Sequence, residues 1–226
     1  MIAAAFVLSG NAVVAAVGTK KNDAAAKSVK FDVAFTPQAP FSNWRDPRQQ
    51  DGCEETVSLM AVWWARGKMT LSKKEAEKQI IAAANYQEKK FGNYHDTNAT
   101  ATQERIIKGY FGFDGAEVKL NARLNDIKNA LTSGSLVIIP ADGRRLKNPY
   151  FTQPGPAEHN LLIIGYDQDK KEFIINDPGT RRGAGYRYSE KIIDLAWRDY
   201  PTGRKLPIKK IEKNLIIIHP QITAKK

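Results

Sequence analysis

The sequence changes character close to residue 135. Beyond this point come four short runs of apolar, mostly β-branched residues, bounded by Pro, Gly or Asp, and such runs are typical of strands. The predicted strands are Leu136–Pro140, Asn160–Tyr166, Glu172–Asn176 and Asn214–His219. No long helical pattern separates them, so we expect the strands to form a mostly antiparallel sheet.

The first half of the chain shows helical spacing instead. The predicted helices are Cys53–Arg66, Ser72–Lys90, Ala101–Phe111 and Leu124–Leu131. The second begins with SKKE, a capping box in which Glu75 reaches back to Ser72. Strict alternation predicts one early strand over residues 29–35, and three prolines make residues 36–52 a loop. The class is therefore α+β, with a helical first half packed on the sheet of the second half.

The two ends of the chain differ from its body. Residues 2–18 carry no charge, so residues 1–28 are expected to be a signal or anchor segment with a linker, and the protein to be exported or membrane-anchored. Residues 29–220 form the expected domain, and residues 221–226 a basic tail. The net charge of +11 suggests an anionic partner such as a membrane surface or cell-wall polymer, or serves solubility alone.

Cys53 is the single cysteine among 226 residues, so the chain has no intrachain disulfide. It stands where the loop QDG meets the helix CEETVSLM. A lone cysteine is usually a small buried apolar residue. At a helix start it can instead be a nucleophile, because the positive end of the helix favours the thiolate and lowers the thiol pKa.

A thiol nucleophile needs a base, and the sequence offers three histidines. His219 ends an apolar strand and is expected to be structural, and His95 lies in a polar loop and is expected to be exposed. His159 follows a Gly/Pro loop and opens a buried strand, which places its ring at the mouth of a cleft. His159 is therefore the predicted base.

The hairpin that His159 begins also supplies an acid. The start of its first strand lies beside the end of its second, where Asp177 stands. A turn centred near Gln168 would set His159 directly opposite Asp177, and a turn one residue later would offset them by two. Alternatively, Asp177 only caps the turn NDPG.

Other chemistries lack their motifs. The chain has no phosphate-binding loop and no zinc-type spacing of Cys and His, so no cofactor and no metal are expected. The most basic run, Arg204–Lys213, lacks interleaved aromatic residues, which gives no indication of specific nucleic-acid binding.

The order of these features resembles papain-like cysteine peptidases. The closer resemblance is to the family thirty-nine-like domain, which is related to bacteriocin-processing peptidases. It is carried by FTPQAPFSNWRDPRQQDGCEETVSLM, LVIIPADGRRLKNPYFTQPGPAEHNLLIIGYD and FIINDPG. It implies a papain-like fold in which Cys53 is the nucleophile, His159 the base and Asp177 the orienting acid.

The resemblance also implies an oxyanion hole. A Gln upstream of the cysteine would donate to the oxyanion, and Gln38 is the expected residue, with Gln49 or Gln50 as alternatives. The processing peptidases have Gly after the cysteine, whereas this chain has Glu54 and Glu55, so a double-glycine leader substrate is not supported. We expect both glutamates to point away from the thiol in the first turn.

Three functions remain open. The leading one is a thiol hydrolase that cleaves a peptide or amide bond in a peptide or protein substrate, which could be associated with the cell wall. An acyl transferase, such as a transpeptidase or transglutaminase-like enzyme, would use the same triad. A catalytically inactive module would bind peptide or anionic cell-wall polymer in the same cleft.

Overall fold

A computed structural model of the chain describes residues 28–221. The apolar segment and linker expected over residues 1–28 and the basic tail expected over residues 221–226 fall outside this range, except for residues 28 and 221 themselves. Among residues 28–221, no helix is long and apolar enough to cross a membrane.

A seven-stranded sheet forms the centre of the molecule, and all its neighbouring strands are antiparallel. The strand order is β2-β7-β3-β4-β5-β6, and β1 pairs with β4. The strands are β1 (Val29–Lys30), β2 (Ala116–Lys119), β3 (Leu136–Ala141), β4 (His159–Asp167), β5 (Glu172–Asn176), β6 (Tyr186–Ser189) and β7 (Leu215–Ile218). The expected mixture of helices with an antiparallel sheet is confirmed.

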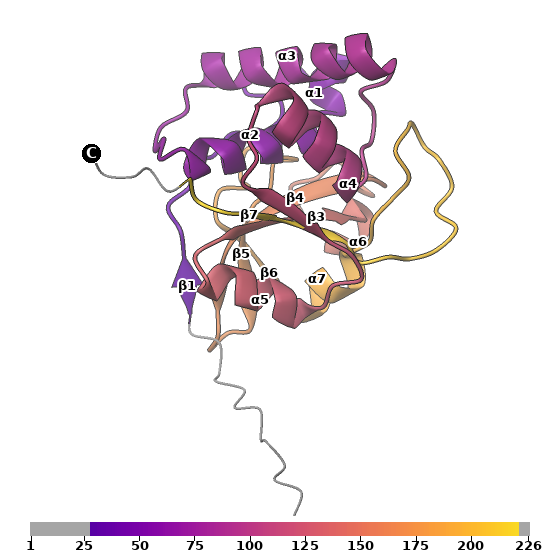
Figure 1. The fold of residues 1–226 in the computed structure, drawn as a ribbon. Helices are drawn as coiled ribbons and strands as arrows, with labels where there is room; N and C mark the ends of the chain where they lie inside the picture. Colours follow the sequence, from indigo (N-terminus) through magenta and orange to yellow (C-terminus); the bar gives the residue numbers. More distant parts are fainter. Residues whose placement is uncertain (1–27, 222–226) are drawn as a thin grey trace, which may run out of the picture.

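Helices cover both faces of this sheet (Figure 1). They are α1 (Pro47–Gln50), α2 (Cys53–Ala65), α3 (Lys73–Phe91), α4 (Ala99–Ala101), the π-helix η1 (Thr102–Tyr110), α5 (Leu124–Thr132), α6 (Gly143–Leu146) and α7 (Glu190–Ala196). One core packs α2 against sheet residues such as Ile138 and Leu162, and the other packs α5 and α7 against Ile139 and Ile163. The strands β3 and β4 are therefore buried on both faces, which explains their unbroken apolar runs.

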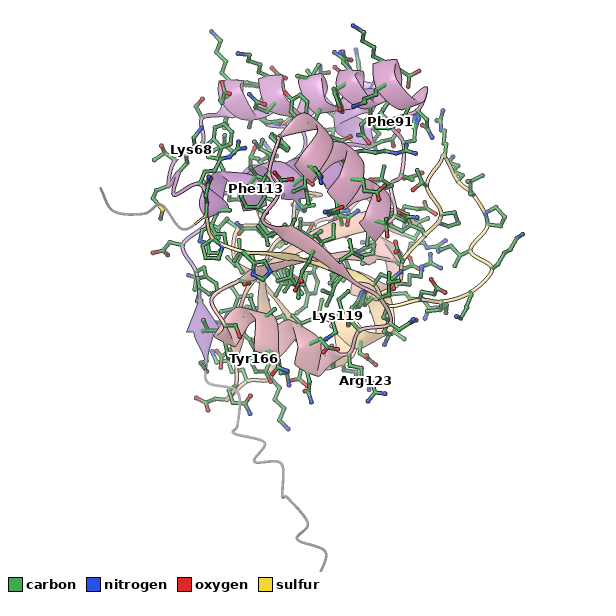
Figure 2. All side chains as sticks on the ribbon, in the orientation of Figure 1. Lys68, Phe91, Phe113, Lys119, Arg123 and Tyr166 are labelled. Atoms are coloured by element: carbon green, nitrogen blue, oxygen red, sulfur yellow. The ribbon has the colours of Figure 1, made fainter. Side chains whose placement is uncertain are left out.

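One aromatic side chain marks each of the two cores. Phe113 belongs to the core that contains α2, and Tyr166 belongs to the core that contains α5 (Figure 2). The ammonium of Lys128 on α5 lies 4.6 Å from the centre of the Tyr166 ring. The first core fixes how α2 meets the sheet, and the second fixes how α5 meets its other face.

The helix α2 is more deeply enclosed than its sequence suggested. The pattern predicted one apolar stripe, but every residue from Cys53 to Val62 is buried. The sheet covers one side of α2, and α3 and η1 cover the outer side (Figure 1). Polar residues in the first turn of α2 are therefore buried as well.

Several elements differ from expectation. The early strand pairs only over Val29–Lys30, although Phe31 and Phe35 still pack on the core. Pro47 begins a short helix inside the expected loop, because Asp46 caps it and Pro suits a first helical position. The strands β2 and β6 and the helix α7 were not predicted, since four polar-rich residues give too short a pattern for either strand. In the capping box, Ser72 accepts from the backbone of Glu75, whose side chain bonds Gln79 instead.

Candidate active site

Cys53 is the first residue of α2, and the residues just before the helix fix its position. Gly52 has no room for a side chain, because an ideal Cβ there would lie 2.5 Å from the carbonyl oxygen of Arg48. This close approach leads the chain from α1 directly into α2. Cys53 is only 5% exposed, yet it lines a pocket of about 1000 Å³.

His159 and Asp177 meet at the end of the β4–β5 hairpin. The hairpin contains a bulge and pairs Leu162 with Asn176, so Asp177 lies diagonally across from His159 rather than directly opposite. The Nε2 atom of His159 is 2.9 Å from Oδ1 of Asp177, and both side chains are buried. Of the two pairings that the sequence left open, the structure has the one in which His159 and Asp177 are offset by two residues. Side chains on one face of a sheet still make contact at that offset.

Four donors surround the Asp177 carboxylate. Oδ1 accepts from His159 and from the backbone N–H of Gly179, and Oδ2 accepts from the Tyr188 hydroxyl and the Asn148 amide. Burial alone would raise the pKa of Asp177, but the charge of His159 and these hydrogen bonds outweigh it and hold the pKa below its ordinary value. The group beside His159 is thus an ionised carboxylate at neutral pH.

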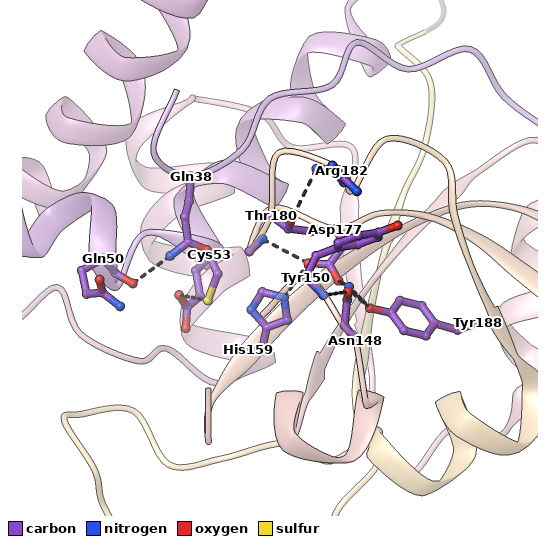
Figure 3. A network of polar contacts seen from close by, with 12 residues as sticks. Gln38, Gln50, Cys53, Asn148, Tyr150, His159, Asp177, Thr180, Arg182 and Tyr188 are labelled. Carbon is purple, nitrogen blue, oxygen red and sulfur yellow. Dashed lines mark hydrogen bonds and ion pairs between the residues drawn. The ribbon is translucent and has the colours of Figure 1, made fainter. Parts of the chain in front are cut away.

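Two further residues of the site, Asn148 and Tyr188, were not predicted from the sequence. Asn148 follows α6, Tyr188 lies on β6, and they bond each other at 2.7 Å (Figure 3). Neither stands in a recognisable motif, and only the folded sheet brings them to Asp177. Gly179 was not predicted either. It leaves room for the His159 ring, because an ideal Cβ at this position would lie 3.0 Å from Cε1 of His159.

The environment of the thiol contradicts two expectations. Glu54 does not point away from Cys53, because the thiol donates a hydrogen bond to Oε2 of Glu54 at 3.0 Å, and Glu54 is 2% exposed. The pKa of Cys53 is raised rather than lowered, through burial first and then through the charge of Glu54 and its hydrogen bond. The helix start does not offset a buried carboxylate placed directly on the sulfur.

Glu55 is buried too, contrary to the expectation of an outward-pointing side chain. Its Oε1 accepts from the amide of Gln87 on α3 at 2.5 Å. Burial and the neighbouring charge of Glu54 raise the pKa of Glu55 well above its ordinary value. Glu55 is thus enclosed by α3, whereas Glu54 is bonded by Thr97 before α4 and by Tyr200 after α7.

The three candidate glutamines occupy different environments. Gln38 is buried and lines the pocket together with Cys53. Its backbone N–H donates to Pro178 in the loop after Asp177, which ties it to the sheet side of the pocket. Its side-chain Nε2 donates to the carbonyl oxygens of residues 49 and 50 at 3.0 and 2.7 Å, and the buried Oε1 has no partner among the described residues.

Gln49 and Gln50 are less suited to the oxyanion role. The Gln49 side chain is fully buried and donates to Glu77 on α3, so it is directed away from Cys53. Gln50 is exposed and lines the pocket, with its carbonyl turned to Gln38. Of the three, only Gln38 combines burial with a place in the pocket wall.

The pocket extends well beyond the thiol. Figure 3 shows the His159 ring between Cys53 and Asp177, with Tyr150 and Arg182 nearby. The wall further includes the exposed aromatic Trp44 and charged residues of both signs. The charged residues are Asp51, Asp96, Glu158, Arg181, Arg182, Arg204 and Lys205. A pocket of this size and mixed polarity can hold several residues of an extended peptide.

The remaining histidines do not line the pocket. His95 is partly buried rather than exposed, stacked on Tyr94 and 3.6 Å from Asp51. His219 contacts the hydroxyl of Ser135 and is largely exposed. Within residues 28–221, no group of three or more His, Cys, Asp or Glu residues could hold a metal ion.

Comparisons with known proteins show the family of this chain and a related fold. Residues 30–202 match the family described as the Peptidase_C39 like family. A crystal structure described as that of a C39-like peptidase from Bacillus anthracis is similar over 88% of this chain and 100% of its own, with a TM-score of 0.55 and 17% sequence identity. That likeness is one of fold, and no curated protein matches the chain. Because the family match covers more than half of the sequence, the chain belongs to the Peptidase_C39 like family.

Proposed function

We propose that this protein is a thiol hydrolase that cleaves peptide or amide bonds in a peptide or protein substrate. The observation that carries the proposal is that residues of the helical layer and residues of the sheet meet at one pocket. Cys53 enters it from the start of α2, while the hydrogen-bonded pair His159–Asp177 enters it from the sheet. Acyl-transfer chemistry needs a nucleophile, a base and an acid that orients the base.

Each residue has a role in this mechanism. Asp177 holds Nε2 of His159, which leaves Nδ1 as the ring nitrogen free to take the proton of Cys53. The thiolate attacks the carbonyl carbon, and His159 returns the proton to the leaving amine. Water then hydrolyses the thioester with His159 again as base. This is the papain-like form of the mechanism.

The oxyanion would lie between two donors. One is the backbone N–H of Cys53, which as a first-turn amide has no acceptor within the helix. The other is Nε2 of Gln38, which would have to release one of its two carbonyl partners. Such donors act best when the fold holds them rigidly, and the bond from Gln38 to Pro178 supplies that restraint.

A second candidate is a non-catalytic module that binds peptide in the same pocket. The hydrogen bond from the thiol to Glu54 favours it, because the resting cysteine is a neutral thiol. An acyl transferase would use the same residues as the hydrolase. Binding to an anionic cell-wall polymer and action outside the cytoplasm, which follow from the net charge and from residues 2–18, stay predictions.

The test is cleavage of a mixed peptide library, followed by mass spectrometry of the new ends between pH 5 and 8. We expect Cys53→Ala and His159→Ala to abolish cleavage, and His219→Ala to retain it as the matched histidine control. Transfer of the acyl group to added hydroxylamine, which gives a hydroxamate in place of the hydrolysis product, would identify the acyl transferase. Binding of peptides without any turnover by wild type would identify the non-catalytic module.

A further inference from the structure

The buried carboxylate beside the nucleophile has no role in the mechanism above. Glu54 follows Cys53 directly and accepts its thiol hydrogen on Oε2 at 3.0 Å. Its other oxygen, Oε1, accepts from the Tyr200 hydroxyl at 2.7 Å and from the backbone N–H of Thr97 at 3.2 Å. Tyr200 in turn accepts from the amide of Asn160, the residue next to His159, at 2.5 Å.

These contacts fix Glu54 from three separate parts of the chain. Thr97 precedes α4, Tyr200 follows α7, and Asn160 belongs to β4. Three donors on one buried carboxylate suit its ionised form, in which both oxygens only accept. The thiol is therefore held with its hydrogen directed at Glu54, and this is the hydrogen that His159 must remove.

We propose that Glu54 is a positioning residue that holds Cys53 as a neutral thiol in the resting enzyme and releases it when Glu54 becomes protonated. The inference rests on the proposed thiol hydrolase and adds a regulatory partner for its nucleophile. When Glu54 gains a proton, Oε1 still accepts from Tyr200 and Thr97. The new hydroxyl then lies on Oε2, where it donates to the sulfur.

The direction of one hydrogen bond thus reverses. With Glu54 ionised, the bond runs from Sγ–H to Oε2 and stabilises the thiol. With Glu54 protonated, it runs from Oε2–H to Sγ and stabilises the thiolate, whose proton has gone to Nδ1 of His159. No atom is gained or lost apart from the proton that Glu54 takes from solvent.

The groups that face Glu54 favour a switch near neutral pH. They are Cys53 and Glu55 on its own helix, Asp96 in the loop before α4, and Tyr200. Burial first, and then the charge of Asp96, raise the pKa of Glu54 to about 7. Burial and the charge of Glu54 also hold the pKa of Tyr200 well above its ordinary value, so its hydroxyl remains a donor.

The test measures the rate at which iodoacetamide alkylates the protein between pH 5 and 9. Because Cys53 is the only cysteine, the rate reports on this thiol alone. Glu54→Gln places an amide donor against the sulfur and imitates the protonated carboxyl. We expect this variant to react at least about 10-fold faster than wild type at pH 8, since a like charge in contact shifts a pKa by roughly 1–3 units, and to match wild type at pH 5.

Glu55→Gln is the matched control. Glu55 is equally buried but bonds Gln87 rather than the thiol, so this variant should follow wild type much more closely than Glu54→Gln does. Equal rates of wild type and Glu54→Gln at pH 8 would overturn the proposal, whether both proteins react or neither does. A shift of the same size in Glu55→Gln would also overturn it, because general loosening of the helix would then be the cause.

A second variant covers the case in which Glu54→Gln fails to fold, as judged by circular dichroism. Tyr200→Phe removes one donor from Glu54, disfavours the carboxylate and should speed alkylation at pH 8 by a smaller factor; an unchanged rate would then count against the proposal.

Failure of the proposed function would give a different set of results from failure of the role of Glu54. Peptide cleavage that depends on Cys53 and His159, with unchanged alkylation in Glu54→Gln, rejects only the role of Glu54. Faster alkylation without cleavage of any peptide rejects only the hydrolase.

Discussion

Asp177→Asn tests how the carboxylate controls His159. An asparagine has the shape of aspartate but carries one acceptor oxygen and one amide nitrogen. The four donors around Asp177 are arranged in two pairs, His159 with Gly179 and Tyr188 with Asn148. Whichever way the new amide turns, its nitrogen faces one of these pairs.

The two orientations differ in their consequences. An amide nitrogen toward Gly179 would face a backbone N–H that cannot become an acceptor. An amide nitrogen toward Tyr188 faces a hydroxyl that can rotate to accept, and loses only the bond from Asn148. The second orientation is therefore favoured, and the oxygen continues to accept from Nε2 of His159. The loss of one hydrogen bond to a charged group should cost about 1.5–3 kcal/mol, which for a chain of this size lowers Tm by roughly 3–12 °C.

Catalysis should fall because the negative charge is gone. Removing a contacting opposite charge lowers the pKa of an imidazole by roughly 1–3 units, so turnover and alkylation of Cys53 at neutral pH should fall about 10- to 10³-fold. Loss of the correct tautomer would cost more, about 10⁴-fold in a serine-protease triad, the general example for this substitution. Peptide cleavage, alkylation rates and thermal melts of wild type and Asp177→Asn measure these quantities. Turnover within threefold of wild type would refute the reasoning and leave Asp177 as a turn cap.

The remaining predictions concern the pocket wall and its buried charge. Gln38→Ala should lower turnover about 10²–10³-fold while Cys53 is still alkylated, and unchanged turnover would remove it from the oxyanion hole. Gly179→Ala should lower turnover about 100-fold, because the added Cβ would lie 3.0 Å from Cε1 of His159 and small displacements have effects of that size; wild-type kinetics would contradict that tight fit. Stability in urea should fall as pH rises from about 4.3 to about 7, since folded Glu54 keeps a proton that the unfolded chain has released. Glu54→Gln should flatten this slope, and identical slopes in both proteins would count against the raised pKa.

The pairing of His159 with Asp177 was predictable because it is local. Two apolar runs with a polar turn between them define a hairpin, and a hairpin brings its first and last residues together without help from the rest of the chain. The offset of two residues was not predictable, since it depends on where the bulge falls. A bulge reflects packing across the whole sheet rather than a local pattern.

The electrostatics around Cys53 could not be read from the sequence. A glutamate in the first turn of a helix usually faces solvent and stabilises the helix dipole. Here α3 covers Glu55, and Tyr200, far along the chain, supplies the partner that makes a buried Glu54 tolerable. Tyr188 and Asn148 were missed for the same reason, because their contacts join segments separated by 11 and 29 residues from Asp177.

The first core, which packs α2 on the sheet, has a consequence for partial unfolding. Proteins open in cooperative units, and the molecule has two apolar cores, one on each face of the sheet, which we expect to melt separately. Opening the first core alone would carry Cys53 away from His159, while the sheet stayed folded on α5 and α7. Such a species would keep most of its strand structure and lose all activity. Inactivation by denaturant should then precede the loss of strand signal, and proteases that recognise the opened form would remove molecules that have already stopped working.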